Sequence, residues 1–515
     1  MISRMSNFRW LGYVGDAFSY YVLHYYPYEH QTLSILLFLV VLALALLFLQ
    51  RTFAPLLDWE HLGTQRRLVF WGITSLCFVN VLTAELFYFT ESFLIFKTSP
   101  LLAMVGCWMM SRRRYAGGVI LLFLAPMFYQ MAGVYAALVL CALAYLEEKG
   151  EPSRQLTRKL ILYMAAALAG VVIDYGTGNW IVKQISRRVG YDIIPGKSVS
   201  IGSFSEYVSN LTRGLHQLYE SSLGLMMPVW LPLLFSLVIS AVVIVQVCRF
   251  GNRQMLGLYL LYKVGSFLLM CCIEIISPPT EFVCRVICPF YTMQSMNALI
   301  AWYWICRGRD RGRMSRSGAA EEWKEDSGIN CTAWSEKNDA RFPNRNENEK
   351  LIHDEAAEKE RNALHDRQDR LEQLVVLMVT GYVLAQIFFA QIIIANRLLS
   401  ETLDIQYAEE ILDYIADYEE ENGTDITEVS FCVDDNYNAY YPQVNYCHTA
   451  INYRIAGEAT YSLVETVAGW SGRHVGRGSM SQEVYEEYFA GKNWECFQPE
   501  EQIVVLDGIM YCCVY

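Results

Sequence analysis

The stretch Thr32-Leu-Ser-Ile-Leu-Leu-Phe-Leu-Val-Val-Leu-Ala-Leu-Ala-Leu-Leu-Phe-Leu-Gln50 contains no charged residue. A bilayer core about 30 Å thick needs about 20 mostly apolar residues per helix, so this stretch predicts a membrane-spanning helix. Comparable apolar runs recur near 68–90, 93–110, 117–146, 160–183, 223–248, 255–277, 286–306 and 373–395. The chain is therefore expected to be an α-helical polytopic membrane protein.

The composition agrees with a membrane protein that also has polar parts. Hydrophobic residues make up 54% of the 515 residues and charged residues only 18%, against about 25% charged in ordinary soluble proteins. The mean hydropathy of +0.21 is too low for a chain embedded from end to end, so long apolar runs must alternate with polar blocks. A simple soluble enzyme is excluded. The net charge of −12, without a concentrated basic region, also excludes a nucleic-acid binder.

The orientation follows from Lys and Arg, which gather in short cytoplasmic loops. Basic residues mark segments 111–116 and 147–159, and placing both inside requires an even number of crossings between them. The run 117–146 is therefore predicted to be two short helices that meet at Tyr129-Gln130 on the outer side. Counting along the chain gives about ten transmembrane helices with both termini outside.

This topology divides the chain into five parts. We expect an outer interfacial segment, a transmembrane helical domain, a charged and flexible cytoplasmic loop, a last transmembrane helix and a small extracytoplasmic α/β domain, at 1–31, 32–306, 307–372, 373–395 and 396–515. In the last part, Asp404 to Glu421 has helical spacing and stops at Asn422-Gly423. Segments 427–433 and 502–506 have the composition of strands.

Five of the 15 cysteines fall in the expected extracytoplasmic domain, where disulfides are possible: Cys432, Cys447, Cys496, Cys512 and Cys513. An odd number leaves at least one of them unpaired. A metal site there is the weaker interpretation, because His448 beside Cys447 has no CxxC or HxxxH spacing around it. No cofactor is predicted, and metal dependence stays open.

Charged and polar residues gather at the expected outer ends of the helices. Charges near membrane helices are costly and mark candidate functional sites. The set comprises Glu85, Glu91, Lys97, Gln130, Asp174, Glu281 and Arg285, with Arg9 and Asp16 from the N-terminal segment. Their one-sidedness favours a polar cleft in which carboxylates act as bases and cations bind a phosphate. Any one of these charges is also explained by solvation at a helix end. Glu91 has a further explanation, which is a local ion pair with Lys97.

Four short motifs resemble those of the Gtr-type membrane glucosyltransferases, specifically the glucosyl transferase II-like group common in bacteria. They are Arg9-Trp10-Leu11-Gly12-Tyr13, with Phe8 where the family has glycine, Glu85-Leu-Phe-Tyr-Phe-Thr-Glu91, Tyr129-Gln130, and Cys284-Arg285-Val-Ile-Cys-Pro-Phe290. The C-terminal region also resembles that of Gram-positive members. The likeness covers most of the chain except 307–372, and its specificity comes from the order and spacing of the motifs.

The resemblance implies a GT-C-like architecture in a bacterial cell membrane. It also implies transfer of a glucosyl residue from a polyprenyl-phosphate donor to a cell-surface glycan on the outer face. Carried over residue by residue, Glu85 and Glu91 become catalytic or binding candidates, Arg285 contacts the donor phosphate, Tyr129-Gln130 forms the cleft wall and Arg9 lies near the site. Asp16 is a further catalytic candidate, with Lys97 and Asp174 as binding candidates.

The N-terminus departs from this pattern. The family's usual catalytic acids lie in a first outer loop that would precede Arg9-Trp10 and is absent from this sequence. Segment 8–13 resembles an interfacial helix, and the topology leaves 1–31 outside with no helix ahead of it, so we expect an upstream helix and loop to be missing. Two alternatives therefore stay open: a non-catalytic lipid-linked sugar flippase or transporter, and a truncated inactive remnant.

Overall fold

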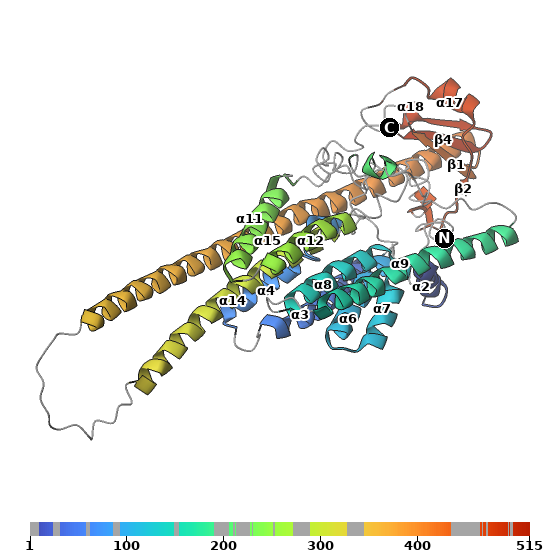
Figure 1. Ribbon diagram of the computed structural model, residues 1–515. Coiled ribbons are helices and arrows are strands. Elements are labelled where there is room, and N and C mark those ends of the chain that lie inside the picture. The colour runs from blue at the N-terminus through green and yellow to red at the C-terminus, as the bar shows by residue number, and fades with distance from the viewer. Residues whose placement is uncertain are drawn as a thin grey trace, which may run out of the picture.

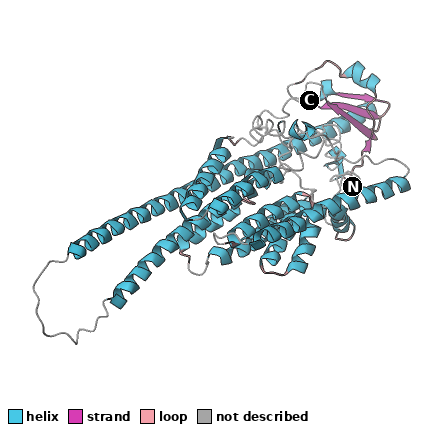
Figure 2. Ribbon diagram, viewed as in Figure 1, coloured by secondary structure: helices cyan, strands magenta, loops and turns pink. Residues whose placement is uncertain are grey.

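The computed structural model is mostly helical, with one small sheet near the C-terminus (Figures 1 and 2). The helices that form the main body are α2 (Trp10–Tyr21), α3 (Gln31–Phe53), α4 (Thr64–Ser75), α5 (Val81–Glu85), α6 (Phe93–Ser111), α7 (Tyr115–Phe128), α8 (Met131–Glu147), α9 (Arg154–Val189), α11 (Trp230–Phe250), α12 (Arg253–Met270), α14 (Pro289–Asp326) and α15 (Arg345–Asn422). A 3₁₀ turn, η1 (Ala54–Leu57), follows α3. The described residues are 10–23, 31–57, 62–85, 93–148, 154–189, 205–209, 212, 227–228, 230–250, 253–270, 289–326, 345–433, 464–465, 467–469, 472–492, 494 and 498–514.

Each apolar run that the sequence singled out contains helix among its described residues. Within the described residues, four helices are long and apolar enough to cross a membrane, at Leu33–Leu57, Arg158–Gly178, Trp230–Phe250 and Asp366–Asn396. Their exteriors carry exposed leucines, such as Leu237 and Leu377, as expected for helices that face lipid. The chain is thus a helical membrane protein, in line with the prediction.

The predicted break in 117–146 is confirmed, because α7 ends at Phe128 and α8 begins at Met131. By contrast, a single helix through 68–90 is wrong. Between α4 and α5 the chain makes a turn in which Asn80 Nδ2 donates to the Leu76 carbonyl and Asn80 Oδ1 accepts from the Thr83 N–H. Asn80 thus caps the N-terminus of α5, and this cap separates α5 from α4.

Helix α8 lies at the centre of the bundle and packs against α6, α7, α9, α12 and α14. Almost all of its residues are buried, and many of them are alanines. Small side chains let neighbouring helices approach closely. Within a bilayer the lipid tails are as apolar as the side chains, so helices associate through such close packing and not through the hydrophobic effect.

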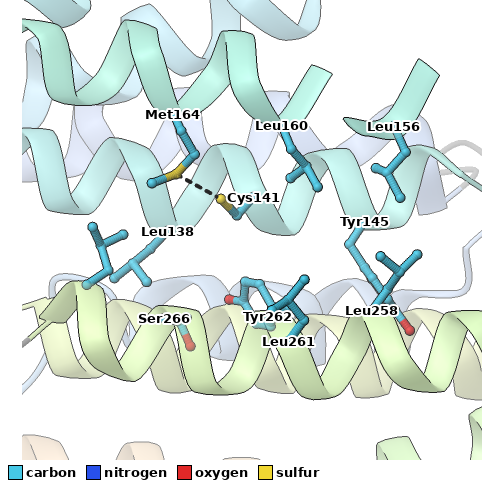
Figure 3. Close-up of a pocket in the computed structure, with 12 residues that line it drawn as sticks. Leu138, Cys141, Tyr145, Leu156, Leu160, Met164, Leu258, Leu261, Tyr262 and Ser266 are labelled. Carbon is cyan, nitrogen blue, oxygen red and sulfur yellow. Dashed lines mark hydrogen bonds between the residues drawn. The ribbon is translucent and has the colours of Figure 1, made fainter. Parts of the chain in front are cut away.

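Helices α9 and α12 both pack on α8 and leave a groove between them (Figure 3). The groove has a volume of about 220 Å³, and its lining is almost entirely apolar. Its floor comes from α8, one wall from α9 and the other from α12, with Leu138, Met164 and Leu258 as representatives of the three helices.

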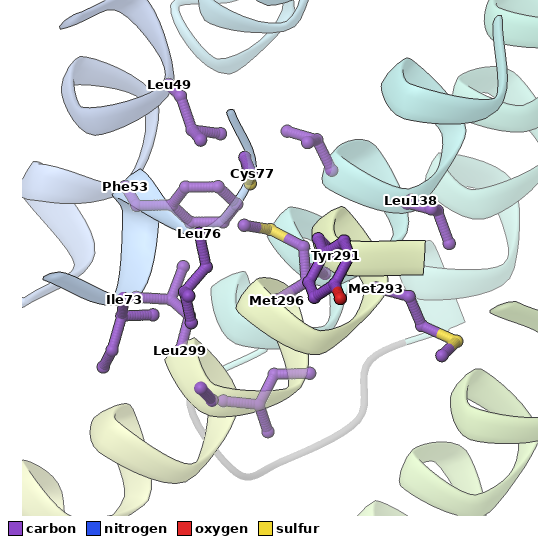
Figure 4. Packing of buried hydrophobic residues seen from close by; sticks show 14 of the residues in the cluster. Leu49, Phe53, Ile73, Leu76, Cys77, Leu138, Tyr291, Met293, Met296 and Leu299 are labelled. Carbon is purple, nitrogen blue, oxygen red and sulfur yellow. The ribbon is translucent and has the colours of Figure 1, made fainter. Parts of the chain in front are cut away.

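The first part of α14 crosses the interior between α3, α4 and α8 (Figure 4). Its side chains are buried from Phe290 to Cys306, and Ser295 Oγ donates to the Ile73 carbonyl at 2.7 Å. This contact joins the beginning of α14 to the end of α4, so the two helices run in opposite directions. An antiparallel pair is what the predicted topology requires of these two segments.

A close backbone approach joins α7 to α9 at Gly170. A Cβ placed on Gly170 would lie 2.9 Å from the Leu122 carbonyl oxygen and 3.0 Å from that of Phe123. Pro126 lies inside α7 and has no N–H, so the Leu122 carbonyl lacks its usual helical hydrogen bond. Glycine at 170 lets α9 cover this carbonyl.

A bidentate ion pair joins α4 to α15 at the end of the bundle opposite to α5. Arg66 Nε and Nη2 donate to the two carboxylate oxygens of Glu372, each at 2.8 Å. The two side chains are only 19% and 14% exposed, so the pair is largely shielded from water.

The two partners of this pair should be coupled in their contribution to stability. We expect Glu372→Ala to lower the free energy of unfolding by about 2 kcal/mol, because a half-buried guanidinium loses its partner. The double variant Arg66→Ala/Glu372→Ala should cost less than the sum of the two single variants. Denaturation of the purified protein in detergent, analysed as a double-mutant cycle, measures the coupling. Strictly additive effects would contradict the assignment.

The segment 307–372 differs from the expected irregular loop. Helix α14 continues to Asp326 and α15 begins at Arg345, with only 327–344 outside the described residues between them. Glu, Lys, Arg and Ala are good helix formers, and they dominate both extensions. The high charge content of 307–372 was therefore not sufficient evidence for an irregular loop.

The C-terminal region is a four-stranded mixed sheet against the end of α15, and its α/β character and two of its strands, β1 and β3, were predicted from the sequence. The strands are β1 (Glu428–Val433), β2 (Gly476–Arg477), β3 (Ile503–Leu506) and β4 (Ile509–Val514), in the order β2-β1-β4-β3. Strand β1 is parallel to β2 and β4, and β3 pairs with β4 in antiparallel fashion. The short helices α17 (Gln482–Tyr488) and α18 (Pro499–Gln502) complete this region.

The two faces of the sheet are covered differently. Val429, Met510 and Cys512 pack on α15, against residues such as Ala408 and Ile411. The opposite face meets Phe489 and Trp494, which pack on Cys513. Among the described residues, no disulfide joins Cys432, Cys512 or Cys513 to another cysteine, and Cys447 and Cys496 lie outside the described residues.

The end of α15 is tied to this sheet region by Glu419. Its Oε1 accepts hydrogen bonds from Arg473 Nη2 at 2.7 Å and from the Ile426 N–H at 2.6 Å. Partial burial raises the pKa of Glu419, but these hydrogen bonds and the charge of Arg473 lower it by more, so the net pKa lies below its usual range.

A lowered pKa makes this contact sensitive to acid. The stabilisation is fully present above the ordinary pKa of a glutamate, about 4.3, and is lost as pH falls through the lower pKa of the folded state. We expect Glu419→Gln to weaken protection of β1 in hydrogen exchange of the full-length protein at pH 7. The difference from wild type should shrink as the pH approaches 3. A difference that does not depend on pH would contradict the ionic origin.

Candidate functional site at one end of the helical bundle

Helix α5 is the element that carries Glu85, at its last residue. Two side chains fix the beginning of this short helix. Asn80 caps the N–H of Thr83, and Gln386 Oε1 of α15 accepts from the Val81 N–H at 3.2 Å. These are N–H groups that a helix cannot satisfy internally. The orientation of α5 is thus set by α15, although the side chain of Glu85 lies outside the described ones.

The Tyr129-Gln130 break lies at the same end of the bundle as the beginning of α6. Ser99 Oγ of α6 donates to the Tyr129 carbonyl at 3.4 Å. Tyr129 is buried and Gln130 is half-buried at the start of α8. Lys97 is two residues before Ser99 on α6, and its side chain is outside the described ones. The break and the start of α6 therefore lie at the same end of the bundle.

Helices α9 and α2 contribute the remaining described elements. A Cβ on Gly133, in the first turn of α8, would touch Val171 and the Ala167 carbonyl, so this part of α9 lies beside the break. Asp174 follows Val171 by three residues on the same helix. Helix α2, which includes Asp16, packs against α6 and α7. The structure thus brings the helices of Asp16, Lys97 and Asp174 to the neighbourhood of the break, without describing these three side chains.

The other predicted residues cannot be placed. Arg9, Glu91, Glu281 and Arg285 lie outside the described residues. Among the residues that are described, no group of three or more His, Cys, Asp or Glu side chains could hold a metal ion.

A buried polar network was missed by sequence reasoning. Tyr259 on α12 donates to Asn297 Oδ1 on α14 at 2.7 Å, and Asn297 Nδ2 donates to Ser240 Oγ on α11 at 3.2 Å. One turn along α14, Gln294 donates to the Pro232 carbonyl and accepts from Tyr382 of α15. The network therefore links α12, α11, α14 and α15.

The same network reaches the candidate site. Gln386 follows Tyr382 by one turn on α15, and it is the residue that accepts from α5. A second feature lies on its other side, where Lys263 Nζ donates to Ser236 Oγ at 3.0 Å. A cation within an apolar helix is costly and therefore a candidate functional group. The sequence does contain a sign of this network, namely Gln, Asn and Lys residues within apolar runs. The prediction missed it because it considered only charged and polar residues at the helix ends.

Comparison of the chain with protein-family models, with curated proteins and with solved structures finds no match. The functional assignment therefore depends on the residues themselves.

Proposed function

We propose that the chain is a glycosyltransferase of the bacterial cell membrane that moves a glucosyl residue from a polyprenyl-phosphate donor to a cell-surface glycan. In this proposal about ten helices cross the bilayer, and the α5 end of the bundle faces outward together with the C-terminal sheet. The proposal is supported by the short motifs of the sequence and by the sidedness of the described elements.

The sidedness is the observation that carries the proposal. Exposed Arg112, Arg113 and Arg114 form the link between α6 and α7, at the opposite end of α7 from Tyr129-Gln130. The Arg66–Glu372 pair also lies away from α5. Because arginine and lysine gather on the cytoplasmic side, this pattern favours an outward-facing site at α5 and the break.

The chemistry that fits this site is a single displacement at a sugar carbon. An acceptor hydroxyl loses its proton to a carboxylate and attacks the anomeric carbon, while the bond to the lipid phosphate breaks and the phosphate leaves as the anion. Glu85, Glu91 and Asp16 are the candidate bases. Arg285, with Arg9 and Lys97, would stabilise the leaving phosphate, and a transition state with oxocarbenium character would be held between them.

A lipid-linked sugar flippase is the second candidate. It is favoured by the buried polar network of Tyr259, Asn297 and Gln294, because transporters often place polar groups between helices within the bilayer. The network differs from a typical translocation path in that its hydrogen bonds are satisfied within the protein.

The two functions separate in one experiment. The full-length protein is placed in vesicles that contain polyprenyl-phosphate glucose with a radioactive sugar, and isolated cell-wall glycan is added outside. Transfer predicts label in the glycan and an equal amount of free polyprenyl phosphate. Movement of intact donor between leaflets without transfer would support the flippase instead. A protein that does neither would overturn both proposals.

A further inference from the structure

Lys263 of α12 brings a positive charge into an apolar part of the bundle. Its Nζ donates to Ser236 Oγ of α11 at 3.0 Å, and the residue is half-buried. Helices α11 and α12 pack on each other, and only residues 251 and 252 separate them in the chain, so they form an antiparallel pair. The ammonium group therefore lies between these two helices.

This charge is deep within the hydrocarbon of a bilayer. Helix α11 is one of the helices that are long and apolar enough to cross a membrane. At 1.5 Å per residue, Ser236 lies about 9 Å along α11 from Trp230 at one end and about 20 Å from Arg249 near the other. Lys263 lies about 15 Å from Arg253 at the start of α12. The ammonium group is therefore well inside both surfaces of a core about 30 Å thick.

The structure shows no counter-ion for this charge. None of the ion pairs within the part of the chain that the structure describes includes Lys263. Its hydrogen-bond partner Ser236 is neutral, and Ser240, one turn along α11, already bonds to Asn297 and to the Ser236 carbonyl. A lysine within hydrocarbon is costly and is usually paired with an opposite charge. An anion beside Lys263 would remove this cost.

The surface around the charge faces lipid. It consists of Ser236 and Leu237 of α11 and of Leu260, Lys263 and Val264 of α12, and we call it the α11–α12 seam. Leu237 is 69% exposed and Val264 is 60% exposed. In a membrane such side chains contact lipid tails or the apolar side chains of another helix. A helix that lies along the seam would therefore contact the apolar side chains and the ammonium group together.

We propose that the α11–α12 seam binds a membrane-spanning helix of a partner protein that has an aspartate or glutamate near its middle. Charge complementarity selects this occupant. A carboxylate on a helix can lie at the depth of Lys263, whereas the anionic headgroups of lipids stay at the surface of the bilayer. A two-fold dimer of this chain through the seam would instead place two lysines against each other. The proposal rests on the membrane placement in the proposed function but not on the transfer reaction.

The probe is a synthetic leucine helix of about 20 residues, long enough to cross the bilayer, with one aspartate at its centre and a fluorescent label. It is mixed with dye-labelled full-length protein in vesicles of phosphatidylcholine, and energy transfer measures binding. We expect this helix to bind about tenfold more tightly than a helix with asparagine at the same place. Asparagine has the same size and forms hydrogen bonds but has no charge. A helix with its aspartate in the first turn should bind no better than the asparagine helix.

Three variants assign the preference to the seam. Lys263→Met keeps the apolar stem without the charge, and it should bind the aspartate and asparagine helices equally. Lys263→Arg keeps a cation at this place and should retain the preference for aspartate. Ser236→Ala is the matched control on α11: it removes the hydrogen bond of Lys263 but not the charge, so the preference should be at least as large as in wild type.

Equal binding of the aspartate and asparagine helices to wild type would overturn the proposal, and so would a preference that persists in Lys263→Met. Phosphatidylglycerol added to the vesicles tests the competing anion. An unchanged preference supports the partner helix, whereas its loss would assign the seam to an anionic lipid and refute the proposal.

Binding of the synthetic helix is measured without sugar donor or acceptor, so it is independent of turnover. A protein that transfers glucose but does not distinguish the two helices thus refutes the seam alone. A protein that binds the aspartate helix but transfers nothing refutes the proposed reaction alone.

Discussion

Glu85→Gln is expected to lower glucosyl transfer by about a hundredfold or more, because removal of a general base typically costs 10²–10⁴ in rate. Glutamine keeps the size of the side chain but cannot take the proton from the acceptor hydroxyl. The helix that carries this residue is capped by Asn80 and by Gln386 from another helix, so its position is defined even though it is only five residues long. The measurement is the initial rate of label transfer in the vesicle assay.

The control for this variant is Glu410→Gln, which changes an exposed carboxylate on α15 far along the chain from the site. It should transfer at the wild-type rate. Arg285→Ala is the companion variant, and it should be equally impaired because the leaving phosphate loses a cation. Wild-type rates in both Glu85→Gln and Arg285→Ala would refute the assignment of the site, whatever the reaction.

Gly170→Ala should destabilise the protein by about 2–3 kcal/mol, whereas Gly176→Ala should stabilise it by up to about 1 kcal/mol. The two glycines lie on the same helix, α9. At 170 the new methyl group would lie 2.9 Å from a backbone carbonyl oxygen of α7, which cannot turn away as a flexible side chain could. At 176 the methyl group meets nothing within 4 Å, so only the better helix propensity of alanine remains.

Denaturation of both variants in detergent measures the two changes in the free energy of unfolding. Because the two changes are expected to have opposite signs, a general effect of alanine cannot explain both. Destabilisation by both variants to the same extent would show that α7 and α9 do not approach as closely as the structure has them. The result bears on the candidate site, because Leu122 and Phe123 lie in the last two turns of α7, just before the Tyr129-Gln130 break.

Sequence periodicity and charge predicted the break between α7 and α8 and the end of α15, but not the turn before α5 or the helical extensions of α14 and α15. The break at Tyr129-Gln130 followed from the arginines on either side of it, and the end of α15 at Asn422 followed from the Asn-Gly pair. Strands β1 and β3 were predicted from short runs of β-branched residues. In each case the information lies within a few residues of the element, which is why one sequence was enough.

The contacts between helices could not be predicted in the same way. The interruption before α5 depends on the side chain of Asn80 and on Gln386, which is about 300 residues away in sequence and adjacent in space. The polar network could not be predicted for the same reason, because Gln294 and Tyr382 become hydrogen-bond partners only when α14 and α15 pack together. The location of the candidate site and the roles of all its residues stay predictions, and Arg9, Glu91 and Arg285 also lie outside the described residues.

Helix α15 is continuous for 78 residues and contributes to both hydrophobic clusters, Val379 and Ile393 to the first and Ala408 and Ile411 to the second. Its segment from Ile393 to Asn422 contains neither glycine nor proline. A helix turns by about 100° per residue, so the number of residues between the two clusters fixes the azimuth of the sheet around the helix axis. Gain or loss of one residue in this segment would therefore rotate the C-terminal region by about 100° around the helix axis relative to the helical bundle.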